Sequence, residues 1–300
     1  MRAALLRLHA AVFIWGFTGV LGRAITLNGT LLVWWRMCIT AVSLWILFYF
    51  TGHIKKIAFR DFLKIGFIGF VLALHWVFFY SSIKYANVSI ALTCLSTTGL
   101  FSALIEPLFF RRRVDMQEIF LGLFALGGIT LIYFYNLHFS IGIYLGLISS
   151  VATVVASVLN KKIVSGYQPM DITLYQLTGG FLGLTLLMPL YNYMFPAPPL
   201  IPHGLDWLWL IILSWCCTIF TFILYIGALK KVSAFTANLL LTLEPVYGII
   251  LAFLLYSENK ELHSNFYIGL GLIFCAVLLQ MLRIAKQQKA TKKIAVPDMP

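Results

Sequence analysis

The chain has 300 residues, of which 61% are hydrophobic and only 11% are charged, and its mean hydropathy is +0.93. Soluble domains carry about 25% charged residues, so this composition excludes a soluble fold and indicates a polytopic membrane protein. The formal net charge of +12 would suggest nucleic-acid binding in a soluble chain, but here the positions of Lys and Arg report on membrane topology instead.

Ten apolar segments follow one another along the chain, each close to the ~20 residues that cross the hydrocarbon core of a bilayer as a helix. They predict transmembrane helices at residues 8–27, 30–51, 62–83, 86–109, 116–135, 141–160, 171–194, 205–227, 232–255 and 266–283. The first segment follows Arg2 and Arg7, as in a signal peptide, but it lacks a small-residue cleavage site. We interpret it as the first membrane helix.

The basic residues are distributed unevenly between the two sides that this topology defines. All Lys and Arg residues except Arg23, Lys84, Lys260 and the embedded Arg36 fall on the side of the N-terminus. Because basic residues concentrate in cytoplasmic loops, both termini are predicted to be cytoplasmic. Residues 284–300 then form a basic cytoplasmic tail, which we expect to be disordered and close to anionic lipid headgroups.

An internal repeat organises the chain. Residues 83–92 align with residues 229–238, each pairing a helix end with a Lys, a tight turn and a new helix. Each half holds five predicted helices, an odd number, so the second half must enter the membrane in the opposite orientation. The predicted fold is therefore all-α, with ten transmembrane helices in two inverted five-helix repeats at 1–138 and 139–283. Secondary transporters are often built this way around a midplane site.

Glu244 lies near the middle of the ninth predicted helix and is followed by Pro245. An acidic residue at that depth costs roughly 3 kcal/mol, so it normally faces a bundle interior or a wet cavity. Pro245 removes one backbone donor and favours a kink at the same point. Three interpretations of Glu244 stay open: it holds a proton, it binds a cationic group of a substrate, or it forms a hydrogen bond with a neighbouring helix.

Other polar and aromatic residues are candidates for the same site. His75 would be a proton-relay partner of Glu244 or a packing residue. Arg36 would recognise a substrate carboxylate, for which its planar guanidinium is well shaped, or would be an interhelical or interfacial anchor. The aromatic candidates for a substrate-binding box, which otherwise belong to the core or the lipid belt, are Trp15, Trp76, Tyr80 and Tyr225.

Two polar stripes at helical spacing are candidates for cavity lining, although Ser and Thr also serve helix packing. They comprise Ser89, Thr93, Ser96 and Thr97 on the fourth helix and Ser149, Thr153, Ser157 and Asn160 on the sixth. From these stripes and the ninth helix we select Thr97, Ser157 and Asn238 as site candidates. The pair Gly179 and Gly183 in the seventh helix predicts close packing against another helix.

The chain resembles the EamA-type members of the drug/metabolite transporter superfamily over about residues 5–283. The residues that carry the resemblance are Trp15-Gly16, Arg36, the stretch 228–248 (ALKKVSAFTANLLLTLEPVYG) and the acidic Glu258. The fourth helix departs from the family pattern, with Thr98-Gly99 at the usual Ser-Pro-like pair and Glu106-Pro107 later in the helix, so its kink is expected to be moved or duplicated. A further departure is Arg112, at a position where the family usually has an acidic residue.

The resemblance implies an exporter of amino acids or related metabolites in a bacterial inner (plasma) membrane that works by alternating access. Its site would be lined mainly by helices 1, 3, 4, 6, 8 and 9. The expected partners are a small-molecule metabolite, the lipid bilayer and protons, without nucleic acid.

Three alternatives are weighed against export. An uptake permease or uncoupled facilitator would have the same fold. A membrane-embedded enzyme would need a metal or nucleophile set, yet the sequence has no HExxH, no GxSxG and no clustered intramembrane carboxylates, so we expect no enzyme and no cofactor. A non-transporting scaffold would not explain the paired repeats. The five cysteines lie in apolar runs without a CxxC pair, as expected of buried thiols.

Overall fold

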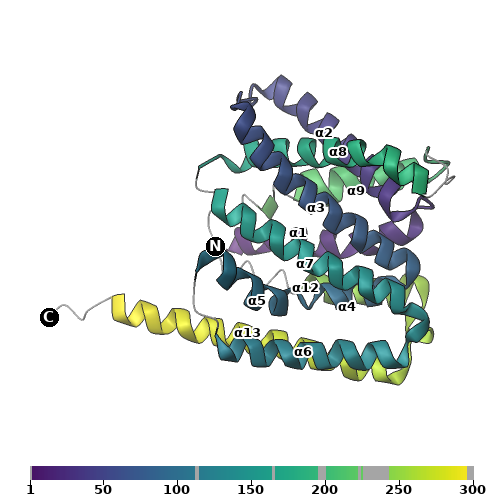
Figure 1. The fold of residues 1–300 in the computed structure, drawn as a ribbon, viewed down its shortest axis with the longest axis vertical. Helices are drawn as coiled ribbons and strands as arrows, with labels where there is room; N and C mark the ends of the chain where they lie inside the picture. Colours follow the sequence, from purple (N-terminus) through teal and green to yellow (C-terminus); the bar gives the residue numbers. More distant parts are fainter. Residues whose placement is uncertain are drawn as a thin grey trace.

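The computed structural model of the chain describes residues 2–111, 115–163, 166–194, 201–221, 224–225 and 243–295, and all regular elements in these ranges are helical (Figure 1). The α-helices are α1 (Arg2–Ala24), α2 (Gly29–Thr51), α3 (Phe59–Tyr85), α4 (Val88–Leu95), α5 (Thr98–Phe110), α6 (Met116–Tyr135), α7 (Ser140–Ile163), α8 (Pro169–Met194), α9 (Asp206–Ser214), α12 (Leu243–Tyr256) and α13 (Ser264–Ala295). A π-helical turn, η2 (Trp215–Phe220), continues α9, and two 3-10 turns, η1 (Leu137–Phe139) and η3 (Glu258–Lys260), precede α7 and α13.

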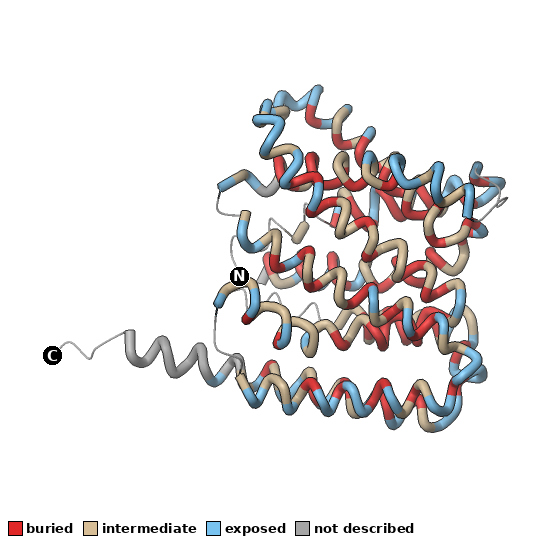
Figure 2. Tube along the Cα trace, in the orientation of Figure 1, coloured by how far each residue is buried: buried red, intermediate tan, exposed pale blue. Residues whose placement is uncertain are grey.

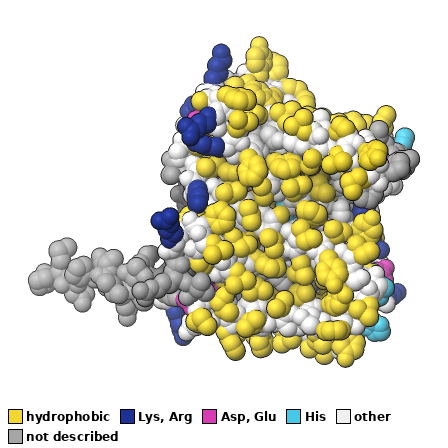
Figure 3. Space-filling view, in the orientation of Figure 1, with side chains coloured by type: hydrophobic (Ala, Val, Ile, Leu, Met, Phe, Trp, Pro, Cys, Tyr) yellow, Lys and Arg dark blue, Asp and Glu magenta, His cyan; other side chains and the backbone are white. Residues whose placement is uncertain are grey.

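The chain is a polytopic membrane protein. Eight helical segments of the described chain are long and apolar enough to cross a bilayer, with α4 and α5 counted together as one of them. Two shorter apolar helices, Asp206–Phe220 and Leu243–Tyr256, border residues outside the described ranges. Hydrophobic side chains cover the bundle between its two ends, and charged side chains gather at the ends (Figure 3).

The helices run roughly side by side across the bundle. The α6–α13 pair forms one edge, α3 packs against both α7 and α8, and α1 packs against α12 (Figure 1). Buried residues line the inward faces of these helices, while the exposed ones face outward (Figure 2). We call the end of the bundle where α1 begins the termini end, and the opposite end, where α1 and α12 finish, the distal end.

Local sequence signals set several of these helix boundaries. Asn28 and Asn87 cap α2 and α4, their side-chain oxygens accepting from the Leu31 amide at 3.0 Å and the Ile90 amide at 2.9 Å. These bonds satisfy backbone donors that the first helical turn leaves unpaired. Gly52 ends α2 in the left-handed conformation, with a φ of 66°, which glycine adopts without steric cost.

Glycines allow the helices to approach closely. A Cβ atom added at Gly69 of α3 would overlap the backbone carbonyl of Gln176 in α8, and one at Gly179 would overlap the Gly66 backbone. The predicted packing role of Gly179 is therefore confirmed. A second close crossing joins α6 to α13, where a Cβ at Gly128 would lie 2.6 Å from the Gly269 oxygen. Small residues serve this purpose in membrane helices, where apolar burial gives little driving force.

We expect Gly69→Ala to destabilise the protein by about 1–3 kcal/mol or more, because the added methyl group meets backbone that cannot rotate away. Gly127→Ala is the matched control, since a Cβ there meets nothing within 4 Å in the same kind of helix. Alanine is also the better helix former, so the control should be neutral or slightly stabilising. Thermal unfolding in detergent measures both, and equal melting temperatures for the two variants would contradict the close α3–α8 contact.

Two sequence expectations about helix ends need correction. The predicted helix 86–109 is divided into α4 and α5 by a break at Ser96–Thr97, next to Thr98-Gly99, and α5 then continues through Pro107. The tail was expected to be disordered, but α13 continues as a helix to Ala295. The segment from Ile284 to that point has no Gly or Pro and is rich in Ala, Lys and Gln, which favour helix.

Candidate functional site

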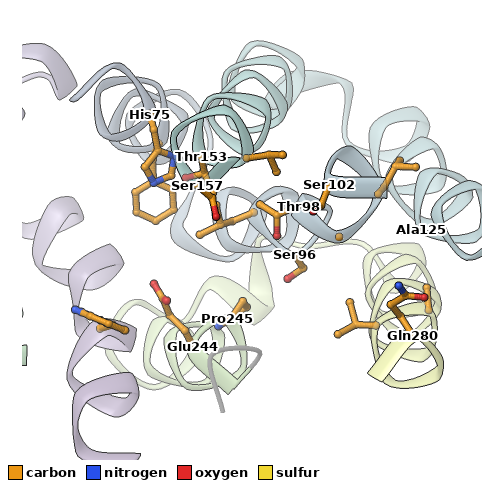
Figure 4. Close-up of a pocket in the computed structure, with 18 of the residues that line it drawn as sticks. His75, Ser96, Thr98, Ser102, Ala125, Thr153, Ser157, Glu244, Pro245 and Gln280 are labelled. Carbon is orange, nitrogen blue, oxygen red and sulfur yellow. The ribbon is translucent and has the colours of Figure 1, made fainter. Parts of the chain in front are cut away.

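A cavity of about 680 Å³ lies inside the bundle and receives side chains from α1, α2, α3, α5, α6, α7, α12 and α13. Its volume is within the range of about 300–1,000 Å³ that is usual for small-molecule sites. Figure 4 shows Glu244 pointing into this space from α12, across from His75 of α3 and Ser157 of α7.

Most of the candidates selected from the sequence meet at this cavity. The lining includes Trp15, Arg36, His75, Trp76, Tyr80, Ser157, Tyr225 and Glu244. Thr97 is not among the lining residues, because its hydroxyl donates to the Cys94 carbonyl oxygen at 2.6 Å beside the α4–α5 break. Asn238 lies outside the described residues.

Arg36 is a buried cation on the cavity wall, only 4% exposed. One terminal nitrogen, Nη1, donates to the Tyr80 hydroxyl at 2.8 Å, while Nη2 and Nε donate to Thr218 Oγ1 at 2.9 and 3.2 Å. The guanidinium carbon lies 4.1 Å from the centre of the Trp76 ring, a cation–π contact. These contacts hold the side chain within the bundle, so Arg36 does not reach toward the interface as an anchor would.

The contacts of Arg36 leave part of its guanidinium available. A guanidinium has five N–H donors, and three of them are used by Tyr80 and Thr218. One N–H on each terminal nitrogen has no acceptor among the described residues. Within those residues, no ion pair within 4 Å joins Arg36 to Glu244 or to another carboxylate. Two donors on neighbouring nitrogens suit the two oxygens of a carboxylate.

The π-helical turn η2 explains why the Thr218 hydroxyl accepts hydrogen bonds from Arg36. The wider turn lets the Thr218 hydroxyl donate to the Leu213 carbonyl oxygen, five residues earlier, at 2.9 Å. With its hydrogen used there, the Thr218 oxygen can only accept, which is what the Arg36 donors require. Local π turns of this kind are frequent at functional sites.

The part of the cavity nearest the termini end contains residues that the sequence did not single out. Gln280 of α13 and Ser102 of α5 both line it, and Glu118 lies in the first turn of α6 (Figure 4). Glu118 is 3.8 Å from Arg283, which also pairs with Asp115. A polar residue near the end of a predicted span normally indicates the membrane interface. This end of the cavity is therefore revealed only by the packing of α6 against both α5 and α13.

At the distal end, a cluster that we call the distal lock closes the bundle around Glu258. The Glu258 carboxylate is fully buried and pairs with Arg23 at the end of α1. It also accepts from the amides of Val88 and Ser89, at 2.9 and 2.8 Å, and from the Ser89 hydroxyl at 2.6 Å. A carboxylate is stabilised there because the first amides of α4 point at it and the helix dipole favours negative charge.

Three further contacts extend the distal lock to the neighbouring elements. Lys84 donates to the backbone oxygens of Arg23 and Ile25, where α1 ends. Asp206, at the start of α9, accepts from the Thr26 amide at 2.8 Å and from its hydroxyl at 2.5 Å. The Tyr256 hydroxyl of α12 donates to the Val20 oxygen at 3.0 Å. The lock therefore joins α1, α3, α4, α9 and α12 beyond the cavity.

The fold and the cavity define a multi-pass helical membrane protein with an internal binding chamber. The sequence model of the EamA-like transporter family matches residues 2–134 and again residues 140–282, and the chain belongs to this family. It is thus a membrane transporter of the drug/metabolite transporter superfamily rather than an enzyme. Among the described residues, no three His, Cys, Asp or Glu side chains are placed to hold a metal ion.

Relatives from distant organisms fit this assignment. An uncharacterized transporter of Bacillus subtilis (strain 168), YxxF, is 23% identical over 295 residues, covering 96% of this chain and 91% of its own. An uncharacterized transporter of Archaeoglobus fulgidus is 23% identical, covering 75% of this chain and 79% of its own. One crystal structure superposes with a TM-score of 0.59 at 17% identity, covering 91% of this chain and 95% of the other, which supports the fold.

Proposed function

We propose that this protein is a secondary transporter that exports small zwitterionic metabolites, amino acids or related compounds, by alternating access. The observation that carries the proposal is that Arg36 and Glu244 present opposite charges to one cavity without pairing with each other. An amino acid has a carboxylate and an ammonium group close together. Its carboxylate would bind the two available N–H groups of Arg36, and its ammonium group would face Glu244.

The wall of the cavity suits the rest of such a substrate. Trp15, Phe79 and Tyr225 offer apolar and aromatic surface, while Thr153 and Ser157 offer hydroxyl groups. An amphipathic side chain would therefore find apolar contact on one side and hydrogen-bond partners on another. This mixture is typical of ligand pockets, where a few polar groups fix orientation within a largely apolar lining.

The proposed architecture is ten helices in two inverted repeats, residues 1–138 and 139–283. The family model matches each half separately, and the shorter helices Asp206–Phe220 and Leu243–Tyr256 would be the described parts of the eighth and ninth spans. The packing of the helices supports the repeat, because the first helix of each half packs on the fourth helix of the other half. Helix α1 packs on α12, and α7, its counterpart in the second half, packs on α4 and α5.

Alternating access is supported by the unequal ends of the cavity. Its lining reaches Glu118 and Gln280 at the termini end, whereas the distal lock closes the bundle beyond Arg36 and Tyr80. With both termini in the cytoplasm of a bacterial inner-membrane protein, as the basic residues predict, this cavity faces the cytoplasm. A cytoplasm-facing cavity is the state in which an exporter takes up its substrate.

Efflux measurements test this function directly. Cells that express the chain should release one or more labelled zwitterions from a panel of amino acids and related metabolites faster than cells with an empty vector. No acceleration for any compound, despite good expression, would contradict export. Net flux in the opposite direction in oriented vesicles would indicate an uptake permease or facilitator instead.

The role of Glu244 in coupling has its own test. We propose that the substrate ammonium group and a proton compete for the Glu244 carboxylate, so that proton entry drives export. Glu244→Gln should abolish the response of transport to a pH gradient, because an amide binds no proton in this range. Glu106→Gln is the matched control, since Glu106 pairs with Lys161 at 3.6 Å and does not line the cavity. A Glu244→Gln variant that still responds to the gradient would dismiss the proton-carrying role.

A further inference from the structure

His75 is held in one orientation by the helix beside it. Its Nδ1 atom lies 3.0 Å from the backbone oxygen of Ser149 in α7 and 2.8 Å from the Ser149 hydroxyl oxygen. The Ser149 hydroxyl also lies 3.0 Å from the backbone oxygen of His75, to which it donates. The ring stacks on Phe79 at an interplanar angle of 26° and lines the cavity (Figure 4).

These contacts fix the position of the imidazole hydrogen. A backbone carbonyl can only accept a hydrogen bond, so the ring nitrogen beside the Ser149 oxygen must be the donor. The Ser149 hydroxyl cannot donate to that nitrogen as well, because its one hydrogen is used by the His75 carbonyl. Nδ1 therefore carries the hydrogen, and in the neutral ring Nε2 is an acceptor.

The surroundings of the ring favour this neutral form. Arg36, a permanent cation, lies on the same cavity wall and contacts Trp76, the residue next to His75. A second positive charge so close, in a buried position, would be unfavourable. The cavity thus has a donor group at Arg36, an acid at Glu244 and a fixed, uncharged acceptor at His75.

We propose that His75 is a specificity-determining residue whose Nε2 accepts a hydrogen bond from an O–H or N–H group on the substrate side chain. This inference rests on the proposed transport of zwitterions and adds a third point of recognition to it. The preferred substrates are zwitterions with a donor on an otherwise apolar side chain. A bound substrate without the donor would cover Nε2 and leave it without a hydrogen-bond partner, and sites built to bind a hydroxyl reject such analogues.

Pairs of amino acids that differ by one hydroxyl group provide the test. We would compare threonine with valine and tyrosine with phenylalanine, as labelled substrates in the same vesicles. The wild-type protein should transport at least one hydroxylated member about tenfold faster than its partner, or more. A ratio near one for both pairs in the wild-type protein would overturn the proposal without any mutation.

Two substitutions locate the preference at His75. His75→Leu removes the acceptor but keeps the backbone oxygen that Ser149 needs, so the ratio should fall to within about twofold of one while valine or phenylalanine transport continues. His75→Gln places an amide oxygen near the Nε2 position and should retain a preference for the hydroxylated member. An unchanged ratio in His75→Leu would overturn the role of His75 but would leave the transport of zwitterions intact. If the wild-type protein transports no zwitterion at all, the proposed function on which the role of His75 rests is wrong.

Discussion

Replacing Arg36 with Lys should lower the transport of zwitterionic substrates about 100-fold, although the positive charge is kept. Lysine has no planar fork, so it cannot bind Tyr80, Thr218 and a carboxylate at the same time. It would also lose much of its stacking on Trp76. The loss of one well-oriented bidentate contact in a buried site is worth several kcal/mol, and each 1.4 kcal/mol is a factor of ten. Initial rates in reconstituted vesicles measure the effect.

A substrate analogue without the carboxylate shows whether Arg36→Lys impairs carboxylate binding or the folding of the whole protein. An amine analogue without the carboxylate cannot use Arg36, so its slow transport should be nearly the same in the wild-type protein and in Arg36→Lys. Thermal unfolding of the two proteins in detergent shows whether the variant is folded. If Arg36→Lys moves the zwitterion at a wild-type rate, or loses both compounds equally while folded, Arg36 has the structural role of an interhelical bond and does not bind the carboxylate.

The position of Arg36 and Glu244 on a cavity could be inferred from the sequence, because a charge within an apolar span is costly unless it faces a bundle interior or a wet cavity. The same reasoning could not identify Thr218, whose acceptor role depends on a π turn and on a partner far away in the chain. Nor could it place Gln280 at the cavity, because this residue lies near the end of the predicted span 266–283 and reaches the cavity through the packing of α13 on α6.

The fourth helix shows where pattern reasoning fails in a membrane protein. A proline is the usual local signal for a kink, but the break at Ser96–Thr97 contains no proline, and α5 continues through Pro107. At the break, the hydroxyls of Ser96 and Thr97 donate to the carbonyl oxygens of Leu92 and Cys94, which also accept from the backbone amides of Ser96 and Thr97. Thr97 has the spacing of a cavity residue, yet its hydroxyl is used by its own helix.

The burial of Glu258 is another feature that the sequence could not predict. The sequence marks it only through the family resemblance, because an acidic residue in a short connection is ordinarily a solvated one. Its burial follows from three elements that are far apart in the chain: the end of α1, the start of α4 and the connection before α13. The distal lock is therefore a property of the tertiary structure, and its proposed gating role needs a test of its own.

Glu258→Gln should open the distal end of the cavity. The amide has no charge for Arg23, and its oxygen can replace only part of the carboxylate that α4 binds. Hydrogen bonds to a charged group contribute roughly 1.5–3 kcal/mol each, and the amide would lose at least one of those that the carboxylate accepts from α4. Because this energy supports only the closed arrangement, the population with an open distal end should rise at least about tenfold. Net transport should fall, since the closed state that loads substrate becomes rare.

A cysteine on α1 reports the opening. Thr18 lines the cavity on the inner side of the lock. The reporter is Thr18→Cys in a protein whose five native cysteines are replaced. It should react slowly with a membrane-impermeant thiol reagent that is added from the distal side. Adding Glu258→Gln should raise that rate about tenfold or more. Transport by the Thr18→Cys protein itself shows that the reporter leaves the site intact.

Glu261→Gln is the matched control for the distal lock. Glu261 also faces Arg23, at 3.5 Å, but its side chain is 41% exposed. An exposed pair of this kind is worth about 0–1 kcal/mol, so the labelling rate should stay within about twofold to fivefold of the starting protein. Arg23→Gln should also raise the labelling rate, since it leaves the buried Glu258 carboxylate without its cation although the bonds to Val88 and Ser89 remain. If Glu258→Gln and Glu261→Gln are labelled at the same rate, the buried carboxylate does not hold the distal end closed, and the gate must lie elsewhere in the bundle.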